Sequence, residues 1–335
     1  MNIETLHLNN FRNHHNITLS FENKNIIVGK NGSGKTSIVE AIFTVLTGRS
    51  FRTNNLKNLI NYSSDFFKLA GVLVDKNYKS RFKLFYKNIK EFYLDDKKVD
   101  KPSDFILKHP VVCYSPENEG LLSNEMEFRR RFLDRTIGYI YPEHLFNLKS
   151  YLKLLNLKKN YIYNNISDPL IYESIHEKMV YYSEKITEKR DSFINKFNEY
   201  IEKNLSRFPS FTSEKFLLFY HKDTIKTDII DKELKEGKIL SGPQRDRVNF
   251  ILNGYKLERI ASFGQKKSLA LFSIYCFIKI VEEFLKSDII VILDDFEAGL
   301  DMERINFFLE KINSSQLFIT GLNEKNFNGF NIIKI

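Results

Sequence analysis

The chain has 335 residues, of which 42% are hydrophobic, so it can form one large core plus a second domain or sizeable insertion, and its composition excludes a disordered chain. Its formal net charge of +9 favours a polyanionic partner such as nucleic acid. Its two cysteines lie in apolar runs without disulfide or metal spacing, and its longest apolar stretch, 269–281, is too short to cross a bilayer. We therefore expect a cytoplasmic protein with no membrane partner.

Short strands are expected over 3–8, 17–21 and 25–28, and the third leads into a glycine-rich loop that fits G-x-x-x-x-G-K-[ST]. This loop and the helix after it, 37–46, predict a site for ATP and Mg²⁺ at a helix N-terminus. Lys35 is expected to contact the β- and γ-phosphates as a catalytic cation, and Thr36 to hold the metal. The nucleotide-binding residues predicted here are Gly29, Lys30, Asn31, Gly32, Ser33, Gly34, Lys35, Thr36 and Ser37.

Alternating residues beyond this helix predict antiparallel strands over 66–74, 81–86 and 91–94, and an apolar run predicts a buried strand over 111–114. From about residue 118 the hydrophobic period becomes that of packed helices, with Leu148, Leu152 and Leu155 on one seam and Met179 and Ile186 on another. We expect an antiparallel helical arm over 118–212 that turns near 164–169. Residues 1–117 and 213–335 would form the two parts of the head around it.

The apolar run 289–293 is typical of a parallel strand buried on both faces, and it ends in two acidic residues. Asp294 is expected to bind Mg²⁺ directly or through water. Asp295 is expected to act as the general base that polarises the attacking water.

The residues Ser262-Phe263-Gly264-Gln265 stand just before a long apolar helix, which precedes the acidic strand. Ser-x-Gly-Gln in this order is typical of ABC-type ATPases, in which this motif closes on ATP bound by the partner subunit. Ser262, Gly264 and Gln265 are therefore nucleotide-binding candidates, although Ser262 alone would also suit an ordinary helix N-cap. The sequence thus predicts an α/β fold, an ABC-type P-loop ATPase head with an inserted helical arm.

In this order the motifs resemble those of the RecF family over nearly the full length. The resemblance is carried by 10–13, the phosphate loop, 48–53, 115–117, 130–134, 241–246, 261–265 and 293–295. The chain departs from the family pattern at Gln244, Arg247 and Gly299, and at Lys266-Lys267 after the signature Gln.

The resemblance implies an SMC-like head that forms a homodimer when ATP is bound and is a weak, DNA-dependent ATPase. Such a dimer would clamp duplex DNA or duplex–single-strand junctions and would work with RecO and RecR to load RecA, in replication restart and SOS induction. It also implies that Arg12 contacts phosphate and that Asp301 acts across the dimer interface. Thr320 stands where other ABC heads place a switch histidine.

The candidate DNA-binding residues are Arg49, Arg52, Lys57, Arg129, Arg130 and Arg131. Lys and Arg contacts to backbone phosphates would give sequence-independent, salt-sensitive affinity. The alternative is a solvated face in which Glu127 and Asp134 pair with the arginines.

Two other functions remain open on the sequence. An ATPase subunit of an ABC transporter would share the nucleotide chemistry, but it would need a transmembrane partner and no heptad arm. A DNA-binding protein that is ordered by nucleotide without significant turnover would share both the arm and the charge.

Overall fold

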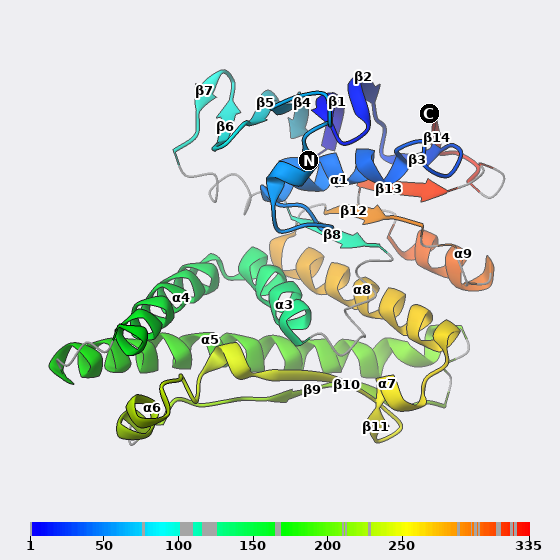
Figure 1. Ribbon diagram of the computed structural model, residues 1–335. Helices are drawn as coiled ribbons and strands as arrows, with labels where there is room; N and C mark the ends of the chain where they lie inside the picture. Colours follow the sequence, from blue (N-terminus) through cyan, green and yellow to red (C-terminus); the bar gives the residue numbers. More distant parts are fainter. Residues whose placement is uncertain are drawn as a thin grey trace. The chain divides into compact units, whose positions relative to one another are not determined.

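The computed structural model describes residues 2–75, 78–100, 110–115, 126–164, 169–209, 211, 213–226, 229–286, 289–295, 297, 300, 302–312, 316–321, 324 and 327–335. The chain divides into two compact units, one of Met1–Glu119 with Lys267–Ile335 and one of Gly120–Lys266 (Figure 1). The second unit runs well beyond the predicted arm boundary at 212. Residues 213–266, which were assigned to the C-terminal part of the head, therefore belong to the same unit as the helices.

A five-stranded sheet, entirely parallel, lies at the centre of the first unit, in the order β14-β3-β13-β12-β8. Its strands are β3 (Lys24–Val28), β8 (Val111–Tyr114), β12 (Ile290–Leu293), β13 (Gln316–Gly321) and β14 (Asn331–Lys334). β8, β12 and β13 are buried throughout, which explains the apolar runs 111–114, 290–293 and 317–319. Because the strands are parallel, the loops after β3, β12 and β13 leave the same edge of the sheet.

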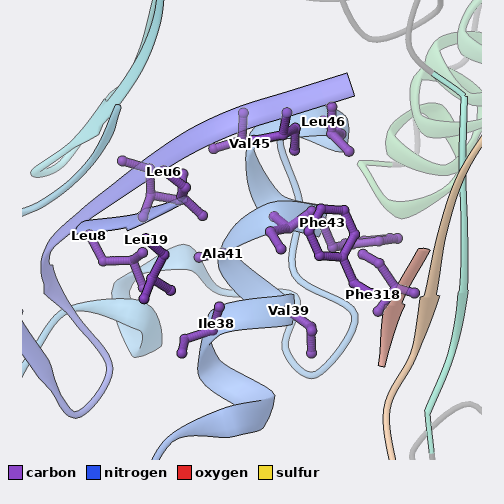
Figure 2. Packing of buried hydrophobic residues seen from close by; sticks show 14 of the residues in the cluster. Leu6, Leu8, Leu19, Ile38, Val39, Ala41, Phe43, Val45, Leu46 and Phe318 are labelled. Atoms are coloured by element: carbon purple, nitrogen blue, oxygen red, sulfur yellow. The ribbon is translucent and has the colours of Figure 1, made fainter. Parts of the chain in front are cut away.

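A second, six-stranded antiparallel sheet of this unit has the order β2-β1-β4-β5-β6-β7. Its strands are β1 (Asn2–Phe11), β2 (His14–Ser20), β4 (Phe67–Asp75), β5 (Tyr78–Tyr86), β6 (Lys90–Leu94) and β7 (Lys97–Lys98). Leu6, Leu8 and Leu19 on its inner face pack around helix α1 (Lys35–Thr47) in one hydrophobic core (Figure 2). α1 is buried on nearly every side, which holds the start of the helix in a fixed place.

Two further helices complete the first unit. α8 (Phe263–Leu285) begins at the boundary between the units, and α9 (Met302–Lys311) packs beside it through the Tyr275 and Phe307 rings, whose centroids are 6.3 Å apart. Throughout the residues described above, every helix is too short or too polar to be a candidate membrane span.

The second unit joins long helices to a three-stranded antiparallel sheet of order β11-β10-β9. Its helices are α3 (Met126–Ile140), α4 (Pro142–Tyr163), α5 (Pro169–Asn204), α6 (Ile230–Glu236) and α7 (Leu257–Ile260). Its strands are β9 (Phe216–His221), β10 (Arg247–Leu252) and β11 (Tyr255–Lys256). Short 3₁₀ turns occupy Leu56–Leu59 in the first unit and Leu205–Arg207 and Pro243–Arg245 in the second.

The seam between α4 and α5 uses one residue other than those expected. Leu155, Met179 and Ile186 pack together as predicted, and Tyr151 completes the cluster. Leu152 is 43% exposed, so its assignment to the seam is wrong. Position 151 lies one turn before Leu155 on the same face, whereas position 152 is rotated toward solvent.

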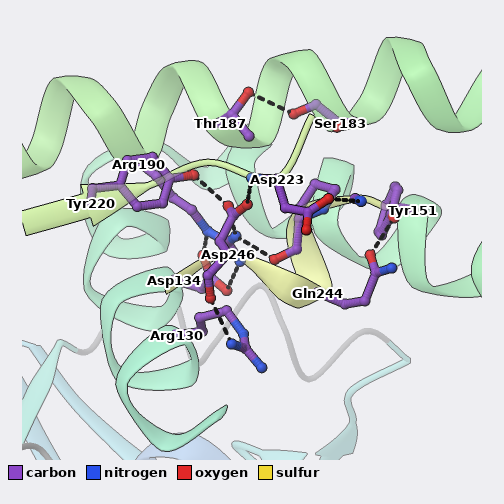
Figure 3. A network of polar contacts seen from close by, with 12 residues as sticks. Arg130, Asp134, Tyr151, Ser183, Thr187, Arg190, Tyr220, Asp223, Gln244 and Asp246 are labelled. Carbon is purple, nitrogen blue, oxygen red and sulfur yellow. Dashed lines mark hydrogen bonds and ion pairs between the residues drawn. The ribbon is translucent and has the colours of Figure 1, made fainter. Parts of the chain in front are cut away.

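A buried ion cluster occupies the place on α5 where the sequence interrupts its apolar seam (Figure 3). Arg190 donates to both oxygens of Asp134 at 2.8 and 2.7 Å, and to Asp246 at 2.6 Å. His144 adds a 2.9 Å contact to Asp134, and Tyr220 donates to Asp246. Each of these charges is therefore paired, as burial requires. The cluster gives Asp246 of the 241–246 motif a structural role.

Two residues depart from the family pattern in this motif, Gln244 and Arg247, and the structure shows where each of them lies. Gln244 accepts a hydrogen bond from the hydroxyl of Tyr151, and its amide donates to the Ser241 carbonyl at 2.8 Å. Gly242 has a φ of 121°, and a Cβ atom there would lie 2.2 Å from the Tyr151 hydroxyl. Arg247 is exposed at the start of β10.

Burial by itself would raise the pKa of Asp134, but the charge of Arg190 and the hydrogen bond from His144 outweigh it and lower the pKa to about 2. An unfolded Asp titrates near ~3.9. The pairing therefore stabilises the folded state above about pH 4, and this contribution is lost as the pH falls from there toward 2.

We expect Arg190→Met to lower the free energy of unfolding by about 3–5 kcal/mol at pH 7, because it leaves two carboxylates buried without their cation. Urea unfolding followed by circular dichroism measures this. Arg131→Met, an exposed position on α3, is the control and should change stability by less than about 0.5 kcal/mol. The loss in Arg190→Met should shrink as the pH falls toward 2.5. Equal urea midpoints for Arg190→Met and the unchanged protein would contradict this account.

Candidate functional site

The glycine-rich loop connects β3 to α1, as its sequence predicts. Gly32 and Gly34 have φ values of 83° and 103°, which favour glycine. Lys35 is the first residue of α1 and is 6% exposed, and its ammonium donates to the carbonyls of Gly29 at 2.9 Å and Lys30 at 3.2 Å. The side-chain cation is thus held against the loop that would surround the phosphates. Asn31 is exposed at the tip, Ser33 is partly buried, and Ser37 is buried in the first turn.

The predicted metal ligands meet at the edge of the parallel sheet. Asp294 follows β12 and is 2% exposed, and one of its oxygens accepts hydrogen bonds from the hydroxyls of Thr36 at 3.0 Å and Thr320 at 2.7 Å. Thr36 lies on α1, and Thr320 is at the end of β13. Residues far apart in sequence therefore converge on one buried carboxylate.

Asp295 is exposed beside this carboxylate and has a φ of 45°. Its backbone N–H donates to the Thr320 hydroxyl at 3.0 Å, so Thr320 contacts both acidic residues. The uncommon backbone conformation turns the chain sharply at the end of the strand. Asp295 is thereby placed at the surface of the site, where it can reach a water molecule.

These residues fit a nucleoside triphosphate with Mg²⁺. The loop N–H groups and Lys35 suit phosphate oxygens, and the oxygens of Thr36 and Asp294 are the hard ligands that Mg²⁺ takes. The hydroxyl of Ser33 is buried, and it has no hydrogen-bond partner within the described chain. No group of three or more His, Cys, Asp or Glu that could hold a metal by itself occurs in that part either. Mg²⁺ needs no such group, because it binds through one or two protein oxygens together with phosphates.

Arg12 pairs with a residue of the helix that follows the phosphate loop. Its guanidinium donates to both oxygens of Glu40 at 2.8 and 2.7 Å and to the Asn58 carbonyl at 3.0 Å, and its contact with phosphate stays a prediction. Glu40 is fully buried on α1, and it also accepts from Ser50 and lies 3.8 Å from Arg52. Arg12 and the 48–53 motif thus support the nucleotide-binding helix from outside.

The turn between β1 and β2 forms one wall of the phosphate loop, which the sequence did not reveal. A Cβ atom at Gly34 would lie 2.4 Å from His14 Nε2 and 2.7 Å from Asn13, and His14 Nε2 is 3.1 Å from the Gly34 carbonyl. Gly34 is therefore required by this close approach as well as by its φ. The Asn10–Asn13 motif was visible in the sequence, but nothing in it pointed to the loop as its partner.

The signature motif forms a reciprocal cap on α8. Ser262 N–H donates to the Gln265 side chain at 2.9 Å, and Gln265 N–H donates to the Ser262 hydroxyl at 3.3 Å. This capping box uses the same residues that would contact a nucleotide, so the N-cap interpretation of Ser262 describes this structure. Ser262 is exposed, and a Cβ atom at Gly264 would meet nothing within 4 Å.

The candidate DNA-binding residues fall into two groups. Arg49, Arg52 and Lys57 are exposed on the segment after α1. Arg129 is buried, donates to the Val248 carbonyl and pairs with Glu258, so its assignment to a DNA-contacting surface is wrong.

The remaining arginines of this run also have partners inside their own unit. Arg130 is partly buried and donates to the Asp246 carbonyl at 2.7 Å. Arg131 is exposed and pairs with Glu127 one turn earlier on α3, as the alternative interpretation anticipated. Asp301 and Gly299 lie outside the described residues.

Comparisons with known proteins agree with this architecture. A family model described as "RecF/RecN/SMC N terminal domain" matches residues 2–334. A curated relative from Bacillus cytotoxicus, "DNA replication and repair protein RecF", is 30% identical over 346 residues, which cover 96% of this chain and 91% of the relative.

Two solved structures share the fold. A structure described as the recombination mediator protein RecF with ATP in the RecFOR pathway aligns with a TM-score of 0.89 at 25% identity, covering 100% of this chain and 97% of that one. The head of an Smc protein bound to the C-winged helix domain of ScpA aligns with a TM-score of 0.56 at 14% identity, covering 99% and 94%, and shows likeness of fold alone.

We expect Thr320→Val to retain ATP binding but to lower turnover at least about tenfold, the equivalent of ~1.4 kcal/mol. Valine has a similar shape but removes the hydroxyl that holds Asp294 and the Asp295 N–H. Binding of a fluorescent ATP analogue and steady-state phosphate release measure the two effects. Thr320→Ser keeps the hydroxyl and is the matched control. Wild-type turnover in Thr320→Val would rule out this role.

Proposed function

The chain belongs to the RecF family of SMC-like ATPases, and from that membership we propose that it is an ATP-dependent DNA-binding protein of recombinational DNA repair. The observation that carries the proposal is the meeting of Thr36 and Asp294 at 3.0 Å, beside a phosphate loop that precedes a buried helix. This arrangement suits Mg²⁺-ATP. The solved RecF relative described with ATP supports the choice of nucleotide.

In this proposal the loop from Gly29 to Gly34 wraps the phosphates with its N–H groups, and Lys35 leaves its carbonyl partners to bind the β- and γ-phosphates. Thr36 and Asp294 hold Mg²⁺, which neutralises charge on the transferred phosphoryl group. Asp295 accepts the proton of the attacking water, and Thr320 keeps Asp295 in position.

We propose further that Ser262, Gly264 and Gln265 of one copy close on the nucleotide held by a second copy. The exposure of Ser262 at the start of a long helix supports this, because a helix N-terminus attracts an anion. Asp301 is the proposed contact across the same interface. Dimerisation would then depend on ATP, and hydrolysis would release it.

The proposed substrate is duplex DNA or a duplex–single-strand junction, gripped by the ATP-bound dimer. The exposed residues Arg49, Arg52 and Lys57 and the net charge of +9 support a phosphate-binding surface. The RecFOR pathway in the description of the solved relative supports RecO and RecR as partners for loading RecA. The place of action would be the cytoplasm.

We expect Ser262→Arg to bind ATP with unchanged affinity but to remain monomeric, because the bulky cation blocks the surface that meets the partner's nucleotide. Its ATP-stimulated DNA affinity should also be lost. Sedimentation velocity with ATP and Mg²⁺ tests the oligomeric state. DNA binding over a salt series, measured without nucleotide, with ADP and with ATP, tests the DNA affinity. Ser262→Thr preserves the cap and should behave as wild type. Lys35→Met should bind no ATP and stay monomeric. An ATP-induced dimer of Ser262→Arg would refute the interface.

We expect Asp295→Asn to accumulate the ATP-bound dimer, because the metal site at Asp294 survives while the base is lost. Turnover should fall about 10²-fold or more. Single-turnover phosphate release and size-exclusion chromatography in ATP measure the two effects. Turnover equal to wild type would remove Asp295 from the mechanism.

A further inference from the structure

One face of the antiparallel sheet of the first unit packs against α1 in the hydrophobic core, and the other face carries a row of charged side chains. On β5, the side chains of Lys79, Arg81 and Lys83 alternate with the buried residues Phe82 and Leu84, so all three cations lie on the face opposite the core. We call this face the outer sheet face. A cross-strand row runs along it from Thr18 through His7, Ala70, Lys83 and Tyr93 to Lys98.

A hollow of about 250 Å³ lies in the middle of this row. Ala70 lines it together with the longer side chains of His7, Arg81, Lys83 and Tyr93, and Asp96 is also part of its lining. The hollow is smaller than the ~300–1,000 Å³ of pockets for drug-sized ligands. It therefore suits one small planar group, such as a single repeating unit of an extended polymer, rather than a whole metabolite.

The positive charge on this face is partly compensated, because two of its lysines are paired and Asp96 also lines the hollow. Lys79 pairs with Glu4 at 2.6 Å and Lys98 with Glu91 at 2.6 Å. Within the described ranges, Lys68, Arg81 and Lys83 make no ion pair. Arg81 and Lys83 line the hollow from β5 together with the acidic Asp96, and Lys68 stands on the adjacent strand β4.

An aromatic ring stands beside these cations in a fixed orientation. The hydroxyl of Tyr93 donates to Glu91 at 3.0 Å, which anchors the far end of the ring. The Lys83 ammonium lies 3.8 Å from the ring centroid and covers one face of it. This places a cation and an aromatic surface at the same point, the pair that single-stranded nucleic acids use for phosphate and base.

We propose that the outer sheet face binds a single strand of nucleic acid, with one base entering the hollow against Tyr93 and the flanking phosphates on Arg81 and Lys83. The proposal rests on the DNA-binding function proposed above and assigns the unpaired strand of a junction to this face. Unpaired bases can lie flat against an aromatic ring, whereas the bases of a duplex are stacked inside it. An acidic peptide would use the cations but not the ring, so the aromatic residue separates the two.

The test measures binding of labelled oligo-dT, a blunt duplex and a duplex with a single-stranded overhang by fluorescence anisotropy over a salt series. Tyr93→Ala should weaken oligo-dT binding about tenfold or more, the loss of one stacked base. Ala70→Ile fills the hollow without changing charge and should weaken it by a similar factor. The double change Arg81→Ala with Lys83→Ala should reduce the log–log salt slope by about 0.7 for each phosphate that the protein no longer binds. Blunt-duplex binding should stay within twofold in all of them.

Lys97→Ala is the matched control, because it removes one exposed cation from the neighbouring β7, where it lies opposite Leu94 rather than Tyr93. It should leave oligo-dT affinity unchanged, and thermal unfolding with ATP binding confirms that every variant is folded. Wild-type oligo-dT affinity in Tyr93→Ala and Ala70→Ile, with duplex binding intact, would overturn this inference alone. Polyglutamate that displaces oligo-dT equally well per charge would overturn it in favour of an acidic protein. Failure of the unchanged protein to bind any DNA would overturn the proposed function as well.

Discussion

The candidate nucleotide site of the first unit is built around one buried carboxylate. The carboxylate of Asp294 is 2% exposed at the end of β12, and the hydroxyls of Thr36 and Thr320 that hold it carry no charge. Burying a carboxylate is costly, and hydroxyl donors reduce that cost. In the proposed function the same carboxylate would also hold the Mg²⁺ of the nucleotide.

The second unit pairs its buried charges with one another. Arg190 lies between two carboxylates, and its guanidinium donates hydrogen bonds to Asp134, to Asp246 and to the Pro243 carbonyl. Such a cluster is satisfied internally, so it specifies how α3, α5 and the loop before β10 meet but attracts no ligand. The two units thus use buried carboxylates differently. Asp134 and Asp246 join elements of the fold through Arg190, whereas Asp294 lies at the candidate nucleotide site beside two hydroxyls.

The candidate nucleotide site could be predicted because its residues are either adjacent in the sequence or placed at the end of a recognisable strand. The spacing from Gly29 to Thr36 fixes a loop before a helix, and an apolar run ending in Asp294 can only be a buried strand with its acid at the tip. The partners of other charged residues could not be read. Arg129 looks identical to Arg131 in sequence, yet it is buried against Glu258, more than a hundred positions away. The same holds for Arg12, whose partner Glu40 sits on a helix face that no local pattern marks. By contrast, the alternation of Lys79, Arg81 and Lys83 can be seen in the sequence. Only the sheet shows that the three side chains share one face.

The way the chain threads through its two units has a consequence for biosynthesis. The second unit is one continuous segment, Gly120–Lys266, whereas the parallel sheet of the first needs β3 from the start of the chain and β12, β13 and β14 from its last fifty residues. Parallel pairing between such distant segments is slow, because the intervening loop must close first. A nascent chain on the ribosome therefore completes its second unit while β3, which precedes the phosphate loop, still lacks its neighbouring strands β13 and β14. Until translation ends, the exposed strand edges of the first unit are the part of the molecule that most needs a chaperone.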